Sequence, residues 1–154
     1  MSAIIDKWLI VVAVVGLAAV LRPKNKWIMP SAGDPWRDVF SAAESKYNLP
    51  EGLLARIALA ESSYNPLAVS PAGAQGLMQI IPRWHPEAEP FDPVHSIWYS
   101  AAYMRRLHDR FGSWTEALAA YNWGQGNLSK KGLAAAPLET RNYIEKIGGD
   151  LGLV

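Results

Sequence analysis

Residues 51–62 read EGLLARIALAES, an apolar run that contains one arginine and ends in a carboxylate and a hydroxyl. The spacing predicts a helix over this stretch, with an apolar face formed by Leu54, Ile57 and Ala58. Glu61 continues that face at i+7 from Leu54. The sequence therefore places a carboxyl at the end of a helix, on the side that packs into the protein.

The position of Glu61 predicts an unusual protonation behaviour. Burial disfavours a charged carboxylate, and the C-terminal end of a helix disfavours negative charge, so both effects raise the pKa of Glu61. A carboxyl that keeps its proton near neutral pH suits a general acid that protonates a glycosidic oxygen. Spacing alone leaves one alternative open, in which Glu61 pairs with a cation such as Arg56 or Arg141.

The segment before this stretch predicts a further helix, and no long alternating strand pattern is present in the sequence. Asp34 is expected to cap this helix, with Pro35 at its first position. One apolar stripe at helical spacing follows and comprises Trp36, Val39, Phe40, Ala43 and Tyr47.

Helical patterns also follow this stretch. A helix is expected to begin at Asp92-Pro93, and another at the capping box Ser113–Glu116, ending at Gly124. A last helix is expected over about residues 139–147. Residues 63–91 are rich in proline and lack helical periodicity, and loops of this length in a small domain are usually functional, so a groove wall is expected there.

The N-terminal segment predicts a membrane anchor. Trp8–Leu21 is an unbroken run of apolar and small residues, and 18 residues from Ile4 to Leu21 would span roughly 27 Å as a helix. The predicted organisation is a transmembrane helix within 1–21, a linker at 22–33 and one helical domain at 34–154. A cleaved signal peptide is the alternative, but the start is not strongly basic and no small-x-small site follows the run. The basic residues after the run favour a cytoplasmic flank, which conflicts with a substrate outside the inner membrane.

Composition excludes several function classes. The chain has 154 residues, a net charge of +1 and no cysteine. A dedicated nucleic-acid partner would favour a strongly basic face, and the absence of cysteine excludes disulfides, thiol nucleophiles and Cys-ligated zinc. The three histidines lack metal-ligand spacing and no glycine-rich phosphate loop follows a strand, so no metal and no cofactor are expected.

Four motifs in order resemble the soluble lytic transglycosylase (SLT) family, within the goose-type lysozyme-like superfamily. They are Glu61-Ser62, GLMQI at 76–80, AYNWG at 120–124 and ETRNYI at 139–144. The similarity extends over about residues 35–150. It implies a mostly α, lysozyme-like domain with long groove loops, preceded here by the single N-terminal transmembrane helix.

The resemblance also implies a reaction on peptidoglycan glycan strands. Such enzymes cleave between N-acetylmuramic acid and N-acetylglucosamine without water and leave a 1,6-anhydro ring. Glu61 would protonate the leaving oxygen and then take the proton of the C6 hydroxyl, with the substrate N-acetyl group assisting. The other carboxylates have no evident catalytic setting in the sequence, and Glu116 is explained by its capping box.

The matching positions give the candidate site. The expected catalytic residues are Glu61, Tyr143 (near the acid) and Ser70 (near the N-acetyl group). The expected substrate-binding residues are Ser62, Gln75, Met78, Gln79, Tyr121 and Asn122. Gly73 and Gly76 suggest a tight loop with backbone close to a sugar. Ordinary core packing is the alternative for Met78 and Tyr143, and a simple turn is the alternative for Ser70.

The sequence departs from the family pattern at one end of the expected cleft. Ser96 and Ser100 stand where members often have Asn and Gly, and Trp98 and Tyr99 lie between them. Two other functions stay open: a goose-type lysozyme-like hydrolase that uses water, and a non-catalytic membrane-bound structural or glycan-binding component. The expected setting is local wall opening by a phage virion or a secretion or conjugation apparatus. The expected location is a virion membrane or the bacterial inner membrane, with virion or envelope-complex proteins as further partners.

Overall fold

The computed structural model describes residues 27–154, which form helices and turns without a β-sheet. The anchor predicted within residues 1–21, and the linker up to residue 26, lie outside the described residues. Within 27–154, no helix has the length and apolarity needed to cross a bilayer. The elements in order are η1 (Ser31–Trp36), α2 (Arg37–Tyr47), α3 (Leu53–Ser62), α4 (Pro93–Phe111), α5 (Trp114–Ala119), η2 (Ala120–Gly124), α6 (Gln125–Lys131), η3 (Leu133–Ala135), α7 (Leu138–Ile144) and η4 (Glu145–Gly149).

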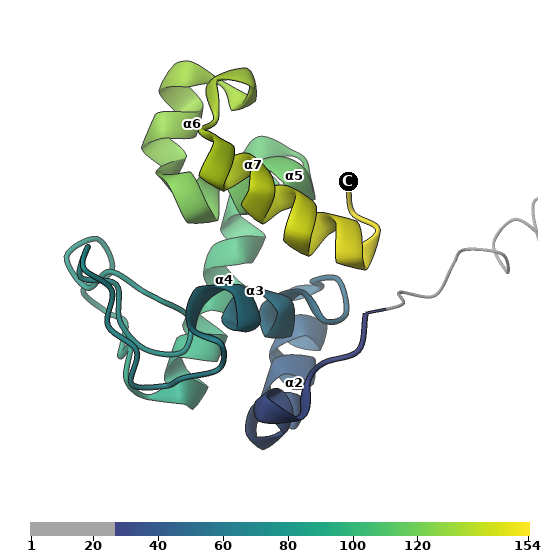
Figure 1. Cartoon of the computed structure of the whole chain (residues 1–154), viewed down its shortest axis with the longest axis vertical. Helices are drawn as coiled ribbons and strands as arrows, with labels where there is room; N and C mark the ends of the chain where they lie inside the picture. The colour runs from purple at the N-terminus through teal and green to yellow at the C-terminus, as the bar shows by residue number, and fades with distance from the viewer. Residues whose placement is uncertain (1–26) are drawn as a thin grey trace, which may run out of the picture.

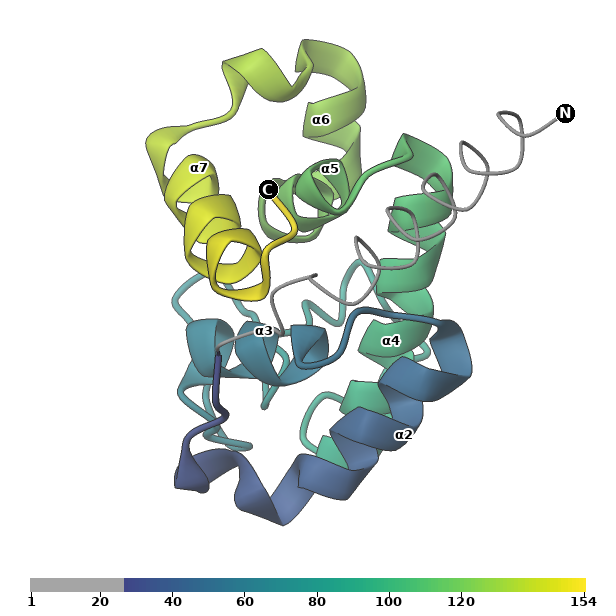
Figure 2. The same cartoon turned by 90° about the vertical axis from the view of Figure 1, so that its right-hand side faces the viewer.

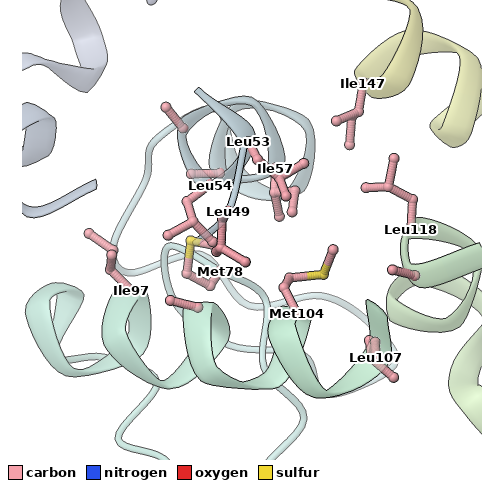
Figure 3. Close-up of a cluster of buried hydrophobic side chains, with 14 of the residues drawn as sticks. Leu49, Leu53, Leu54, Ile57, Met78, Ile97, Met104, Leu107, Leu118 and Ile147 are labelled. Carbon is pink, nitrogen blue, oxygen red and sulfur yellow. The ribbon is translucent and has the colours of Figure 1, made fainter. Parts of the chain in front are cut away.

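The long helix α4 joins two groups of elements (Figures 1 and 2). Helices α2 and α3 and the loop 63–92 lie on one side, and α5, α6 and α7 lie on the other (Figure 1). Buried side chains from α3, α4 and α5 meet in a single apolar core, to which Ile147 of η4 contributes (Figure 3). This arrangement holds the last turn of α3 next to both groups.

Helix α3 lies at the centre of the packing, as its apolar sequence predicts. Residues 53–58 are all buried, and α3 contacts α2, α4 and η4. The N-terminus of α3 is capped from another helix: the Glu44 carboxylate of α2 accepts hydrogen bonds from the backbone N–H groups of Gly52 (2.9 Å) and Leu54 (2.7 Å). These donors have no partner within the helix, so the capping by Glu44 fixes where α3 begins.

The predicted helix starts are correct for α4 and α5 and wrong for α2. The Asp92 side chain accepts from the backbone N–H of His95, and Ser113 accepts from that of Glu116. Asp34, however, lies inside the 3-10 helix η1 and pairs with Arg37 instead of capping. The chain enters α2 through η1, so the first backbone N–H groups of α2 already have partners in the preceding turn.

The segment after α5 differs most from the prediction. The helix predicted to end at Gly124 does end there, as α5 followed by the π-helical turn η2, but a further helix that was not predicted, α6, begins at the next residue. Gly124 has a φ of +94°, which redirects the chain between these two elements. The final predicted helix is present as α7, followed by the π-helical turn η4.

The loop between α3 and α4 has no helix, as predicted, and two isolated antiparallel bridges shape it. Val69 pairs with Gln75, and Gln75 pairs with Ile80. At Gly76, a Cβ atom would lie 1.7 Å from the carbonyl oxygen of Pro90, and φ is +74°. Gly76 is therefore required for a close approach between two parts of the loop.

Candidate active site

Glu61 lies in the last turn of α3 and is partly buried. The Tyr143 hydroxyl, on α7, donates a hydrogen bond of 2.8 Å to Oε1 of Glu61. The two residues are 82 positions apart in the sequence, and they meet because α7 and η4 fold back against α3. The structure thus brings together two of the three predicted catalytic residues.

The surroundings raise the pKa of Glu61 to about 7. Burial is the largest cause; the hydrogen bond from Tyr143 opposes it, and the negative charge of Glu139 adds to it. Near neutral pH, Glu61 is therefore present in both its protonated and its ionised form. A group in this state can give up a proton and accept one in the same pH range.

The alternative in which Glu61 pairs with an arginine is not what the structure shows. Arg56 donates to Oδ2 of Asp150 at 2.6 Å and to the carbonyl oxygen of Lys146 at 3.0 Å. No ion pair involves Glu61 in the described part of the chain. The buried arginine of α3 therefore anchors the C-terminal segment, and Tyr143 is the partner of the acid.

Tyr121 and Asn122 are both fixed by hydrogen bonds to neighbouring elements. The Tyr121 hydroxyl donates to the Met78 carbonyl oxygen at 2.9 Å and lies 3.2 Å from Oγ of Ser100. Oδ1 of Asn122 accepts a bond of 2.8 Å from the Thr140 hydroxyl. Burial raises the pKa of Tyr121, and the charge of Glu61 raises it further, so Tyr121 lies within the electrostatic reach of the acid.

A cavity of about 580 Å³ opens beside these residues. Its walls are formed by the loop after α3, by α4, and by the segment from η2 into α6. Three predicted substrate-binding residues line it: Gln79, Tyr121 and Asn122. Glu61, Tyr143 and Ser70 are not among the lining residues. Tyr121 connects the two regions, because it lines the cavity and also feels the charge of Glu61.

Met78 is a correction to the sequence prediction. Its side chain is fully buried in the core, so it is not a groove wall, and only its carbonyl oxygen, through Tyr121, contributes to the site. The loop conformation explains this placement. Gln79 has a φ of 50° and its side-chain nitrogen donates to the carbonyl oxygens of Ala68 and Gly76, which directs Met78 inward and Gln79 toward the cavity.

The remaining predicted residues stabilise the loop. The Ser62 hydroxyl lies within hydrogen-bonding distance of the carbonyl oxygens of Ala58 (3.2 Å) and Leu77 (2.8 Å), which joins α3 to the loop. Oγ of Ser70 accepts from the Ala74 backbone N–H at 3.0 Å, within a turn. The backbone of Gln75 takes part in both antiparallel bridges, one with Val69 and one with Ile80. The close approach at Gly76 is to backbone of the loop itself, and this differs from the predicted approach to a sugar.

Sequence reasoning missed several aromatic residues of the cavity. Trp84, His85 and Tyr103 line it, together with Tyr99. Nδ1 of His85 lies 2.9 Å from the Tyr99 hydroxyl, and its ring packs edge-on against Tyr103 at 4.8 Å. The departure from the family pattern at Tyr99 was a usable signal for this end of the cavity. Trp98, next to it, instead packs edge-on against Tyr47.

Comparisons with known proteins agree with this geometry. The family described as "Transglycosylase SLT domain" matches residues 38–144. The transglycosylase of Enterobacteria phage PRD1 is 36% identical over 124 residues, which cover 77% of this chain and 44% of that protein. Membrane-bound lytic murein transglycosylase F of Alcanivorax borkumensis is 38% identical over 104 residues, which cover 60% of this chain and 22% of that protein.

The fold also matches a solved structure. The crystal structure of the 70 kDa soluble lytic transglycosylase from Escherichia coli superposes with a TM-score of 0.66 at 27% identity, covering 75% of this chain and 23% of that one. The chain spans less than half the length of each of these relatives. The chain belongs to the transglycosylase SLT domain family.

Proposed function

We propose that this chain is a peptidoglycan lytic transglycosylase in which Glu61 is the single acid and base. The observation that carries the proposal is the Glu61 carboxyl, which has a pKa of about 7, a tyrosine as its hydrogen-bond partner and no ion pair within residues 27–154. The family of the chain and the names of its relatives support the choice of substrate.

The proposed reaction uses Glu61 twice. The protonated carboxyl gives its proton to the glycosidic oxygen as the bond from that oxygen to C1 of N-acetylmuramic acid breaks. The substrate N-acetyl oxygen stabilises the positive charge at C1. The Glu61 carboxylate then takes the proton of the C6 hydroxyl, whose oxygen bonds to C1 and closes the 1,6-anhydro ring. The acid regains its proton, and no water is consumed.

Tyr143 supports both steps through its bond to Oε1. A donor to the carboxylate stabilises the ionised form that exists between the two proton transfers, and it also fixes the direction of the carboxyl group. Tyr121 and Asn122 are proposed to hold the sugar against the cavity wall. Ser70 is proposed to act near the N-acetyl group, although its hydroxyl here also accepts from Ala74.

The experiment compares wild type with Glu61→Gln and Glu139→Gln on isolated peptidoglycan. Wild type is expected to release soluble fragments, and Glu61→Gln is expected to release them about a hundredfold or more slowly while keeping its circular dichroism spectrum. Glu139→Gln is expected to keep activity, since its negative charge only raises the pKa of Glu61. Loss of activity in Glu139→Gln with an intact fold would instead support a two-carboxylate hydrolase. Equal activity of wild type and Glu61→Gln would contradict the proposal.

We also propose that the domain acts from a membrane surface in local wall opening, as part of a virion or an envelope apparatus. The apolar run Trp8–Leu21 supports a tether, and the names of the phage and membrane-bound relatives support the setting. Fractionation followed by protease protection tests this. The full chain should sediment with membranes and the domain should be cut only from the outer side; recovery in the soluble fraction would contradict the tether.

A further inference from the structure

The lining of the cavity next to Glu61 includes a basic side chain but no acidic one. No aspartate or glutamate lies among its lining residues, and Lys130 on α6 is the one lysine or arginine among them. Burial and the charge of Arg106 lower the pKa of His85, which favours the neutral form of its ring. The aromatic walls of the cavity are thus combined with a positive end at α6.

Further cations surround the same cavity, each held against a side chain of its wall. They are Arg83 over the Trp84 ring (4.5 Å), Arg106 over Tyr103 (5.6 Å), Lys131 over Trp123 (5.6 Å) and Arg110, whose guanidinium donates to Oε1 of Gln125 (2.7 Å). These four residues and Lys130 are called the cationic rim. All five are exposed.

Within residues 27–154, no carboxylate forms an ion pair with the cationic rim. Helix α4 shows the contrast within a single element: Arg105 pairs with Asp109, whereas Arg106 and Arg110 form no ion pair with any carboxylate of residues 27–154. The same holds for the other members of the rim. Among the described residues, Glu87 is the acid whose charge affects the pKa values of His85 and Tyr99. The rim is therefore available to an anion supplied from outside.

Two positions of the rim are preorganised for this purpose. Stacking on Tyr103 holds Arg106, and Arg110 is held by Gln125 and also by the hydroxyl of Ser129 (3.2 Å). Guanidinium groups fixed in this way lose little freedom when they bind a carboxylate. The loop 63–92 and α6 belong to different groups of elements, but both lie toward the left in Figure 1 and both line the cavity, so a glycan on the aromatic wall would bring its substituents to the rim.

We propose that the cationic rim binds a carboxylate carried by the glycan strand, so that the preferred substrate is a strand with anionic substituents. This inference rests on the proposed function. The carboxylate has two chemical sources: the lactyl group of muramic acid after its peptide is removed, or the acidic groups of an attached peptide stem. Both present the same group to the rim, and the substrates of the experiment distinguish them.

The experiment measures kcat/KM on three soluble glycans of equal length. The first keeps its peptide stems, the second has lost them and exposes the lactyl carboxylate, and in the third all carboxylates are converted to methylamides. The variants are Lys130→Gln, Arg106→Gln and the double variant. Lys46→Gln, an exposed cation of α2 away from the cavity, is the matched control.

Each single rim variant is expected to lower kcat/KM on anionic substrate about two- to fivefold, and the double variant about tenfold, with no change on the neutralised glycan. The difference between substrates should vanish at an ionic strength of about 0.5 M, where exposed charges are screened. Lys46→Gln should match wild type. A larger effect on the stem-bearing glycan would identify the stem as the source, and a larger effect on the stem-free glycan would identify the lactyl group.

Equal loss on neutral and anionic glycans, or no loss on either, would overturn the proposal. Binding to the inactive Glu61→Gln variant, followed by tryptophan fluorescence, separates this failure from failure of the proposed function. In one outcome, wild type cleaves none of the glycans while the variant still prefers glycans with carboxylates and loses this preference when the rim is changed. That result would support carboxylate binding by the rim and contradict the proposed reaction. Cleavage without a preference for anionic glycans would support the proposed reaction and contradict carboxylate binding by the rim.

Discussion

Replacement of Tyr143 by phenylalanine removes the hydroxyl that donates to Oε1 of Glu61 at 2.8 Å. This bond stabilises the ionised carboxylate and therefore lowers the pKa of Glu61 against the effect of burial. A hydrogen bond to a charged group contributes about 1.5–3 kcal/mol, and about 1.4 kcal/mol corresponds to one pH unit. The pKa of Glu61 in the variant is expected to rise by about one to two pH units.

The assay is the pH dependence of kcat/KM on solubilised peptidoglycan. The general acid acts in its protonated form, so wild-type activity should fall as the pH rises through about 7. In Tyr143→Phe this fall should move to higher pH, even if the maximum rate is lower. The control is Tyr47→Phe, which removes a hydroxyl on α2 and should leave the profile unchanged. A profile that stays in place or moves to lower pH would show that the Tyr143 hydroxyl does not stabilise the ionised form of Glu61.

Three further changes test other parts of the structure. Glu61→Gln should reduce cleavage by about a hundredfold or more, as measured by release of soluble fragments, while glycan binding is kept; binding lost together with activity would argue against a purely chemical role. Gly76→Ala should destabilise the fold by about 1–3 kcal/mol more than Gly73→Ala in urea unfolding, because its Cβ would meet the Pro90 carbonyl oxygen, whereas at Gly73 no atom lies within 4 Å; equal losses would contradict the close approach. Burial raises the pKa of Glu44 from 4.5 to about 7, so the native state holds a proton that the unfolded chain releases, and stability should fall as the pH rises between these values, by at most about 1.4 kcal/mol per pH unit for this group; Glu44→Gln should reduce that slope, and an unchanged slope would count against it.

Local sequence signals predicted those parts of the fold that local interactions determine. Asp92 and Ser113 cap their helices with bonds to residues three positions ahead, and both starts were correct. Asp34 had the same kind of signal, but its side chain pairs with Arg37 inside η1. The cap that α3 uses, Glu44, lies on another helix and has no local signal.

In the candidate site, too, the sequence predicted what local spacing determines and missed what depends on tertiary contacts. Helical spacing alone indicated that Glu61 leaves the apolar face of its helix, but not which group it meets. The bond from Tyr143 depends on how α7 packs against the rest of the domain, and this information came only from the family motifs. Met78 was misplaced, because the positive φ of Gln79 decides which of two neighbouring side chains faces the cavity.

The proposed reaction, in which Glu61 acts alone and no water is consumed, can be tested directly. Peptidoglycan is digested by the purified chain in water labelled with heavy oxygen, and the fragments are analysed by mass spectrometry. We expect fragments with 1,6-anhydro-N-acetylmuramic acid ends and no incorporated label. Fragments with reducing ends that carry the heavy oxygen would show that the enzyme hydrolyses the glycan and does not form the anhydro ring.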